Sequence, residues 1–111
     1  MSAPAAGSDG AVIYEVNLDL DADIADAYLL WLDEHIEVMC ALPGFSGASV
    51  YEVVEPHADA GRQRLSVHYT LNDQAALDAY LSDHAAQMRA EGEARFGGRF
   101  RASRRVLGQV G

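Results

Sequence analysis

The stretch VIYEVNLDL at residues 12–20 decides the fold of this 111-residue chain. Its large apolar residues recur at every second position, which is the period of a β-strand with one buried face. Tyr14 and Leu18 belong to the predicted buried face, whereas Glu15 and Asn17 belong to the other face. The stretch therefore predicts a strand of a sheet that is covered on one side.

The periods on either side of this strand predict the rest of the topology. Helical spacing follows over 24–42, alternation over 46–54 and 64–71, helical spacing over 74–96, and alternation over 99–107. The order β-α-β-β-α-β predicts a ferredoxin-like α+β fold, with a four-stranded antiparallel sheet and two helices on one face. In this order the first and third strands are central and the last strand pairs with the first. We expect one domain over 11–108, after a disordered tail over 1–10.

Two details follow from this topology. Pairing of the first and last strands places Glu15 and Asp19 across from the arginines at 101 and 105. The polar residues after the first strand include Asp21 and Asp23, either of which is expected to cap the first helix.

The composition excludes several classes of function. Asp and Glu number 17 against 8 Arg and no Lys, which gives a net charge of −9. Such a surface repels phosphate backbones and anionic lipids, so we expect neither nucleic acid nor membrane as a partner. The absence of lysine excludes Schiff-base chemistry, and the single cysteine, Cys40, excludes an intrachain disulfide. We expect a cytoplasmic, bacterial-type protein.

The sheet face away from the helices carries apolar residues that need a cover. Ile13 and Tyr51 lie on this face beside His68 and Arg101, by the alternation of their strands. An apolar surface of this kind indicates an interface, and two-fold homodimers are the commonest soluble assemblies. We therefore predict that these four residues belong to a dimer interface with a second copy of the chain.

The chain resembles the dimeric α/β-barrel superfamily, and within it a small bacterial family of unknown function. The segments that carry this resemblance are IYEVNLDLD, WLDEHI, LPGFSGASVYEV, HYTLND, LDAYLSDHA and RFGGRFRASRRVL. The best-known members of the superfamily are antibiotic-biosynthesis-type monooxygenases. The resemblance implies a homodimeric α/β barrel. It does not define a reaction, because the superfamily includes oxygenases, haem-degrading enzymes and regulatory ligand binders.

The resemblance to the haem-degrading members is incomplete. Those enzymes surround the haem with an Asn, a Trp and a His. In this sequence Asn17 is predicted to face away from the helices, and the single Trp, Trp31, lies on a helix instead of a strand. We therefore expect no cofactor. The helix-facing positions offer too few ligands for a metal ion, so we expect no metal site either.

The candidate catalytic residues are His84, His35, Tyr28 and Tyr80, on predicted helices that pack on the same sheet face. His84 is predicted in the middle of the apolar stripe of the second helix. Acid–base chemistry in a pocket is one interpretation of these residues, and hydrogen-bonded core residues are the other. Candidate ligand-binding residues beside them are Trp31, Tyr69 and Met88.

Two functional hypotheses remain open at this point. The first is a small-molecule-binding or regulatory module, because no complete catalytic constellation is present. The second is a cofactor-independent monooxygenase that acts on a small aromatic substrate between helices and sheet. The resemblance supplies the precedent for the second, since such oxygenases hold a phenolic substrate that itself activates oxygen.

Overall fold

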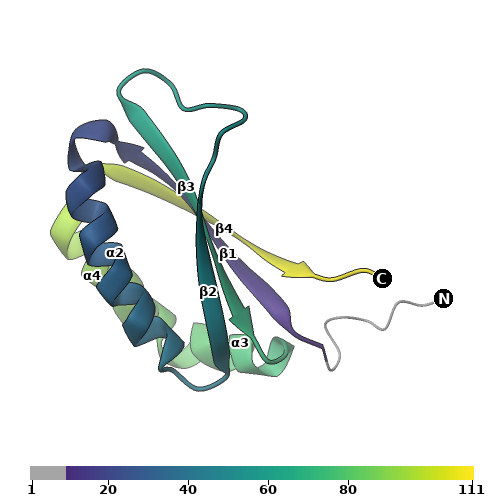
Figure 1. Cartoon of the computed structure of the whole chain (residues 1–111). Helices are drawn as coiled ribbons and strands as arrows, with labels where there is room; N and C mark the ends of the chain where they lie inside the picture. Colours follow the sequence, from purple (N-terminus) through teal and green to yellow (C-terminus); the bar gives the residue numbers. More distant parts are fainter. Residues whose placement is uncertain (1–9) are drawn as a thin grey trace.

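The computed structural model describes residues 10–111 and has the predicted order of elements (Figure 1). The predicted tail at 1–10 lies, apart from Gly10, outside the described residues. The strands are β1 (Val12–Asp21), β2 (Phe45–Glu52), β3 (Arg62–Leu71) and β4 (Phe100–Gly108). The helices are the short 3₁₀ helix η1 (Ala22–Ile24), α2 (Ala25–Cys40), α3 (Gln74–Asp83) and α4 (Ala85–Phe96).

The sheet has the strand order β2-β3-β1-β4, and all three pairings are antiparallel. Helices α2, α3 and α4 lie on one side of it, and the other side is open (Figure 1). The ferredoxin-like α+β fold is thus confirmed. The predicted register of the outer pair is also confirmed, because Glu15 faces Arg105 and Asp19 faces Arg101 across β1 and β4.

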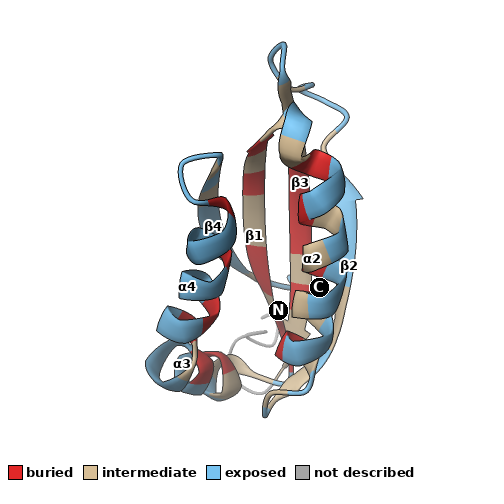
Figure 2. Cartoon of the chain, turned by 90° about the vertical axis from the view of Figure 1, so that its left-hand side faces the viewer, coloured by how far each residue is buried: buried red, intermediate tan, exposed pale blue. Residues whose placement is uncertain are grey.

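The core lies between the sheet and the helices. Figure 2 shows buried residues along β1 and β3 and on the sides of α3 and α4 that face the sheet. Leu20, Leu71 and Leu77 have no exposed surface, and the Tyr14 and Tyr69 rings belong to the same buried cluster. The alternation of β1 therefore places its apolar residues as predicted, with Glu15 as the one buried exception on the opposite face.

The second helix predicted over 74–96 is wrong as a single element, because the structure has two helices there. α3 begins after Asp73, whose carboxylate accepts a hydrogen bond from the Ala76 N–H. It ends at His84, where the backbone leaves helical geometry with φ −129° and ψ −28°. The His84 N–H still bonds to the Tyr80 carbonyl, and α4 then starts at Ala85. His84 therefore occupies a joint and not the middle of an apolar stripe.

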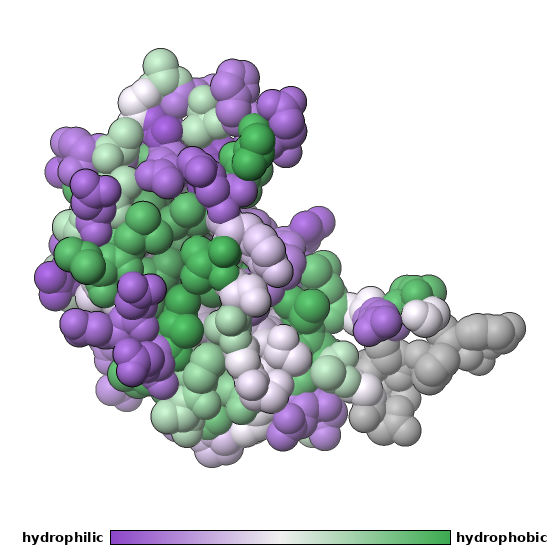
Figure 3. All heavy atoms as spheres, viewed as in Figure 1, coloured by the Kyte–Doolittle hydropathy of each residue, from purple (hydrophilic) through white to green (hydrophobic). Residues whose placement is uncertain are grey.

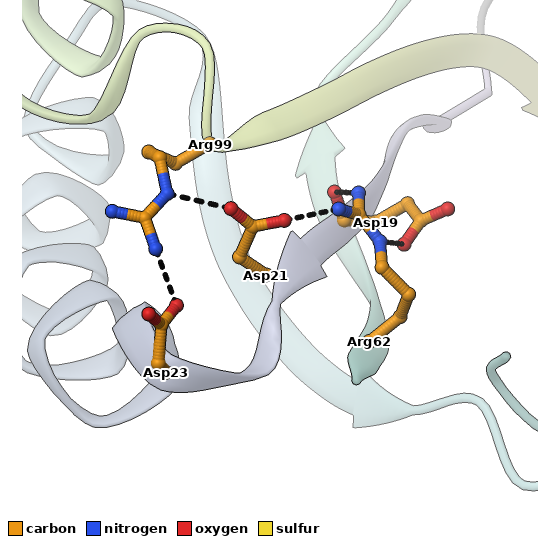
Figure 4. A network of polar contacts seen from close by, with 5 residues as sticks. All are labelled: Asp19, Asp21, Asp23, Arg62 and Arg99. Carbon is orange, nitrogen blue, oxygen red and sulfur yellow. Dashed lines mark hydrogen bonds and ion pairs between the residues drawn. The ribbon is translucent and has the colours of Figure 1, made fainter. Parts of the chain in front are cut away.

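A charge cluster joins three strands at the end of β1 (Figure 4). Arg62 of β3 pairs with Asp19 and Asp21, and Arg99, next to β4, pairs with Asp21 and Asp23. The expectation that Asp21 or Asp23 caps the first helix is wrong, since neither η1 nor α2 has a side-chain cap. The carboxylates of Asp21 and Asp23 instead pair with the guanidinium groups of Arg62 and Arg99, because the ends of the neighbouring strands lie beside the end of β1.

Several apolar side chains are exposed on the helix side of the molecule. Figure 3 shows a hydrophobic area over α2, bordered by hydrophilic residues. Leu30 and Val38 of α2 and Val50 of β2 are exposed.

Within residues 10–111, no helix is long and apolar enough to span a membrane.

Candidate functional site

A small cavity of about 50 Å³ lies between the sheet and the two long helices. Both helices lie over the same face of the sheet, and in the view of Figure 2 α4 lies to the left of β1 and β3 and α2 to the right. The helices approach each other at Gly92 of α4, where an added Cβ atom would lie 3.2 Å from the Trp31 indole. Sixteen residues line the cavity. Its aromatic wall consists of Tyr14, Tyr28, Trp31, Tyr69, Tyr80 and Phe100.

The structure brings six of the seven predicted site residues to this cavity. The six are Tyr28, Trp31, His35, Tyr69, Tyr80 and Met88. His84 does not line it. The imidazole of His84 is stacked near the Tyr80 ring, with centroids 6.5 Å apart, at the joint between α3 and α4. The break between the two helices thus places His84 at their joint, outside the lining of the cavity.

Three tyrosine hydroxyls of the cavity lack a hydrogen-bond partner in the described part of the chain. Tyr28, Tyr69 and Tyr80 are buried, and no hydrogen bond to their hydroxyls is found within residues 10–111. Burial raises the pKa of Tyr28 and of Tyr80 to about 12, and it raises that of Tyr69 as well. These phenols are therefore protonated at neutral pH and able to donate hydrogen bonds.

His35 adds a second kind of polar group to the cavity. Its imidazole is stacked on Trp31, with ring centroids 4.5 Å apart, and its side chain is 11% exposed. Its Nδ1 atom is buried without a hydrogen-bond partner in the described part of the chain, and a carboxylate oxygen of Glu91 is 3.9 Å away. Burial lowers the pKa of His35, partly offset by Glu91, so the ring is neutral at pH 7.

Two further residues of the cavity lining, Arg89 and Arg104, were not predicted from the sequence. Arg89 of α4 donates from Nη2 to the Tyr14 hydroxyl at 2.9 Å. Arg104 of β4 lies opposite Val16 of β1, which places it on the helix side of the sheet. The alternation of β4 would have predicted this place for Arg104, because Phe100 and Ala102 lie on the same side of the strand.

The chemistry available in the cavity is hydrogen bonding and charge pairing in an aromatic surrounding. Phenols and guanidinium groups donate, and the His35 Nδ1 atom is able to accept a hydrogen bond or a proton in one tautomer. No group of three or more His, Cys, Asp or Glu side chains is placed to hold a metal ion within residues 10–111.

A wider hollow of about 320 Å³ lies on the open face of the sheet, at the β2–β3 loop. Its charged residues have both signs, with Asp19 and Asp59 beside Arg64 and Arg101. Among residues 10–111 it contains no buried side-chain polar atom that lacks a partner. The aromatic cavity is therefore the better candidate for a ligand site.

The open face is organised around Glu15, which is only 4% exposed. Glu15 accepts hydrogen bonds from Arg105 Nε at 2.6 Å and Asn17 Nδ2 at 2.8 Å, and its Oε2 lies 3.0 Å from His68 Nε2. The Tyr51 ring packs edge-on against His68, with centroids 5.1 Å apart. Hydrogen bonds from Arg105 and then Asn17 lower the pKa of Glu15 to about 2.

The remaining residues of the predicted interface surround this network. Ile13 lies opposite Leu107 of β4 and Thr70 of β3. Arg101 lies opposite Asp19, but the Asp19 carboxylate pairs with Arg62, and Arg101 is exposed. Ile13, Tyr51, His68 and Arg101 therefore share the open face, by the register of their strands.

The sequence matches the family described as "Domain of unknown function (DUF4286)" over residues 11–110. The chain belongs to this family. No curated protein matches it in sequence.

Solved structures share the fold of this DUF4286 domain at low sequence identity. Rv0793 from Mycobacterium tuberculosis is 23% identical, with a TM-score of 0.63 over 92% of this chain and 97% of that one. SnoaB from Streptomyces nogalater, described as a cofactor-independent oxygenase, is 10% identical, with a TM-score of 0.62 over 88% and 92%. An ethyl tert-butyl ether d (ethd) family protein from Bacillus halodurans is 14% identical, with a TM-score of 0.63 over 89% and 99%.

The Glu15 network makes a prediction about acid stability. Because its folded pKa lies below the unfolded value, Glu15 stabilises the fold above about pH 4.5 and loses this contribution as the pH falls towards 2. Glu15→Gln should lower the free energy of unfolding at pH 7 on the order of 1–2 kcal/mol, reduced by solvent at the 68% exposed Arg105. Urea unfolding at pH 7 and pH 3 measures this difference.

The matched control is Glu52→Gln, at an exposed position of the edge strand β2. We expect the difference between wild type and Glu15→Gln to shrink at pH 3, whereas Glu52→Gln stays close to wild type at pH 7. An equal difference at both pH values would show that Glu15 stabilises through packing and not through its charge.

Proposed function

We propose that this DUF4286 protein is a homodimeric small-molecule-binding module whose ligand occupies the cavity between the helices and the sheet. The supporting observation is that the hydroxyls of Tyr28, Tyr69 and Tyr80 and the Nδ1 atom of His35 belong to one cavity and lack hydrogen-bond partners among residues 10–111. A buried polar group without a partner, such as this Nδ1 atom, costs about 1–3 kcal/mol. A ligand that hydrogen-bonds to it removes this cost.

The size of the cavity limits the ligand. An engineered cavity of about 150 Å³ binds benzene, so the 50 Å³ found here is too small for a whole aromatic ring without movement of its walls. Arg89 and Arg104 are exposed members of the lining. Their flexible side chains are able to move without disturbing the core, so the ligand is expected to extend past them.

Cavity binding is tested by filling the cavity with one added ring. Val16→Phe places the ring in the cavity, whereas Val50→Phe places it on the same sheet face at the exposed edge strand. We expect a set of small planar compounds to raise the thermal midpoint of the wild type and Val50→Phe, but not of Val16→Phe. Equal shifts in Val16→Phe, or no shift with any compound, would contradict the proposal.

The homodimer is the second part of the proposal, and the open sheet face supports it. No helix of the described chain covers this face (Figure 1). It carries Ile13 and Leu107 beside Tyr51, which is 52% exposed, and the buried Glu15 network lies on the same face. A second copy would bury this apolar surface and keep the paired charges away from water.

The dimer is tested by placing a charge on that face. Tyr51→Asp adds a carboxylate beside the Glu15 network in the proposed interface, and Leu30→Asp adds one to an exposed apolar position of α2. Sedimentation should give twice the 12.0 kDa chain mass for wild type and Leu30→Asp, and the single-chain mass for Tyr51→Asp. A monomeric wild type, or dissociation by Leu30→Asp alone, would place the interface elsewhere or exclude it.

A second candidate function is a cofactor-independent monooxygenase, and the geometry of His35 supports it. Its neutral imidazole with an open Nδ1 atom is the group that a phenol needs as a proton acceptor. With hydroquinone the balanced reaction consumes one O₂ and yields hydroxybenzoquinone and water, the substrate supplying the electrons. SnoaB is described as a cofactor-independent oxygenase on the same fold.

Oxygen uptake with hydroquinone distinguishes the two functions. If the oxygenase function holds, His35→Leu should lower the rate at least about a hundredfold, because the proton acceptor is lost. The control His57→Leu, in the exposed β2–β3 loop, should keep the wild-type rate. A wild-type protein that binds ligands without consuming oxygen above the rate in buffer would exclude this reaction and leave the binding module.

A further inference from the structure

The lining of the cavity has a charge opposite to that of the protein. Among its sixteen residues are two arginines and no aspartate or glutamate. The whole chain has 17 acidic residues against 8 arginines. A lining that is cationic in an acidic protein is typical of a site for an anion, because charge complementarity selects the ligand and repels cations.

Arg104 is an arginine of the cavity lining that has no counterion in the described part of the chain. Its neighbours near and on β4, Arg99 and Arg105, pair with Asp21 and Glu15, respectively. Arg104 makes neither an ion pair nor a side-chain hydrogen bond within residues 10–111. Among residues 10–111, Arg99 and Arg105 thus have counterions, whereas Arg104 at the cavity and Arg101 on the open face have none.

Arg104 lines the same cavity as the unpartnered hydroxyls and acts electrostatically on two of them. Its charge acts on the Tyr28 and Tyr80 phenols, where it opposes part of the rise in pKa that burial causes. Arg89 reaches the same cavity from α4 and donates only one of its hydrogen bonds, to Tyr14. Two guanidinium groups, from the strand and from the helix, thus border one aromatic pocket.

We propose that the ligand of this cavity is a small planar carboxylate, whose carboxylate group binds Arg104 and Arg89 and whose apolar body lies between the aromatic side chains. This inference rests on the binding function proposed above and names its ligand class. A guanidinium group presents paired N–H donors that match the two oxygens of a carboxylate. The phenol hydroxyls supply further donors for the same oxygens.

The surrounding charges orient this ligand. Glu91 lies 3.9 Å from His35 Nδ1, and Glu93 acts on Tyr28 from outside the lining. Both carboxylates belong to the part of α4 that follows Arg89, so they repel an anion at the His35 end. The carboxylate of the ligand therefore belongs at Arg104, and the other end of the ligand points towards Trp31 and His35. A free phosphate would satisfy the arginines but leave the aromatic wall without a contact.

The test compares acids with their uncharged amides of nearly equal shape. Benzoate and benzamide, and the smaller trans-crotonate and crotonamide, are titrated into the full-length protein by calorimetry at pH 7.5 and low salt. Inorganic phosphate is the third probe. The variants are Arg104→Gln, which removes the charge at the cavity, and Arg95→Gln, which removes one from the exposed side of α4 over the Phe96 ring.

We expect the wild type to bind an acid about tenfold or more tightly than its amide, because a charge-assisted hydrogen bond replaces a neutral one. Arg104→Gln should weaken binding of the acid about ten- to a hundredfold and leave the amide within about twofold. Arg95→Gln should change neither. Phosphate should compete poorly with either acid.

Four results would overturn the inference. They are equal affinity for acid and amide, equal weakening by Arg104→Gln and Arg95→Gln, phosphate binding as tight as that of the acids, and no binding of acid or amide. Val16→Phe distinguishes a failure of this inference from a failure of the proposed function. The wild type could bind the acid and the amide with equal affinity while Val16→Phe binds neither. In that case the cavity still binds ligands, and only the preference for carboxylates is wrong.

Discussion

The pairing of β1 with strands on both of its sides is the constraint on which the rest of the structure depends. β1 is central, because β3 pairs with one of its edges and β4 with the other. On each face of the sheet, residues of β1 therefore lie between residues of β3 and β4. Its helix-facing side forms the floor of the cavity through Tyr14, Val16 and Leu18. Its open side holds Glu15, which ties β3 and β4 together through His68 and Arg105. A shift of one residue in this register would exchange the two faces.

The cavity lies where the two long helices and the sheet meet, because residues of α2, α4 and the strands line it together. Trp31 and Gly92 mark the place where α2 and α4 meet, and Gly92 permits this approach because it lacks a side chain. Beside this contact the aromatic rings do not fill the space, and the His35 Nδ1 atom has no partner within residues 10–111. The cost of such a group is tolerable in a site that binds a polar molecule, and it would be hard to explain in a core that serves stability alone.

The open face and the cavity use charge in different ways. On the open face the buried Glu15 has partners, Arg105 among them, and the network holds strands in register. At the cavity Arg104 has no counterion in the described chain, although it is next to Arg105 in sequence. Neighbouring residues of one strand point to opposite faces, so a single run of arginines serves a structural network on one side and borders the candidate ligand site on the other.

The sequence by itself determined the order of elements and the strand order, and it placed Glu15 and Asp19 across from the arginines at 101 and 105, because alternation and helical spacing directly report which faces are buried. It also indicated the aromatic residues of the cavity, since Tyr28, Tyr69 and Tyr80 follow those same patterns. Only the tertiary structure decided that the second helix breaks at His84 and that Arg104 borders the cavity without a counterion in the described chain. Both depend on packing between elements distant in sequence, which periodicity within one element does not encode.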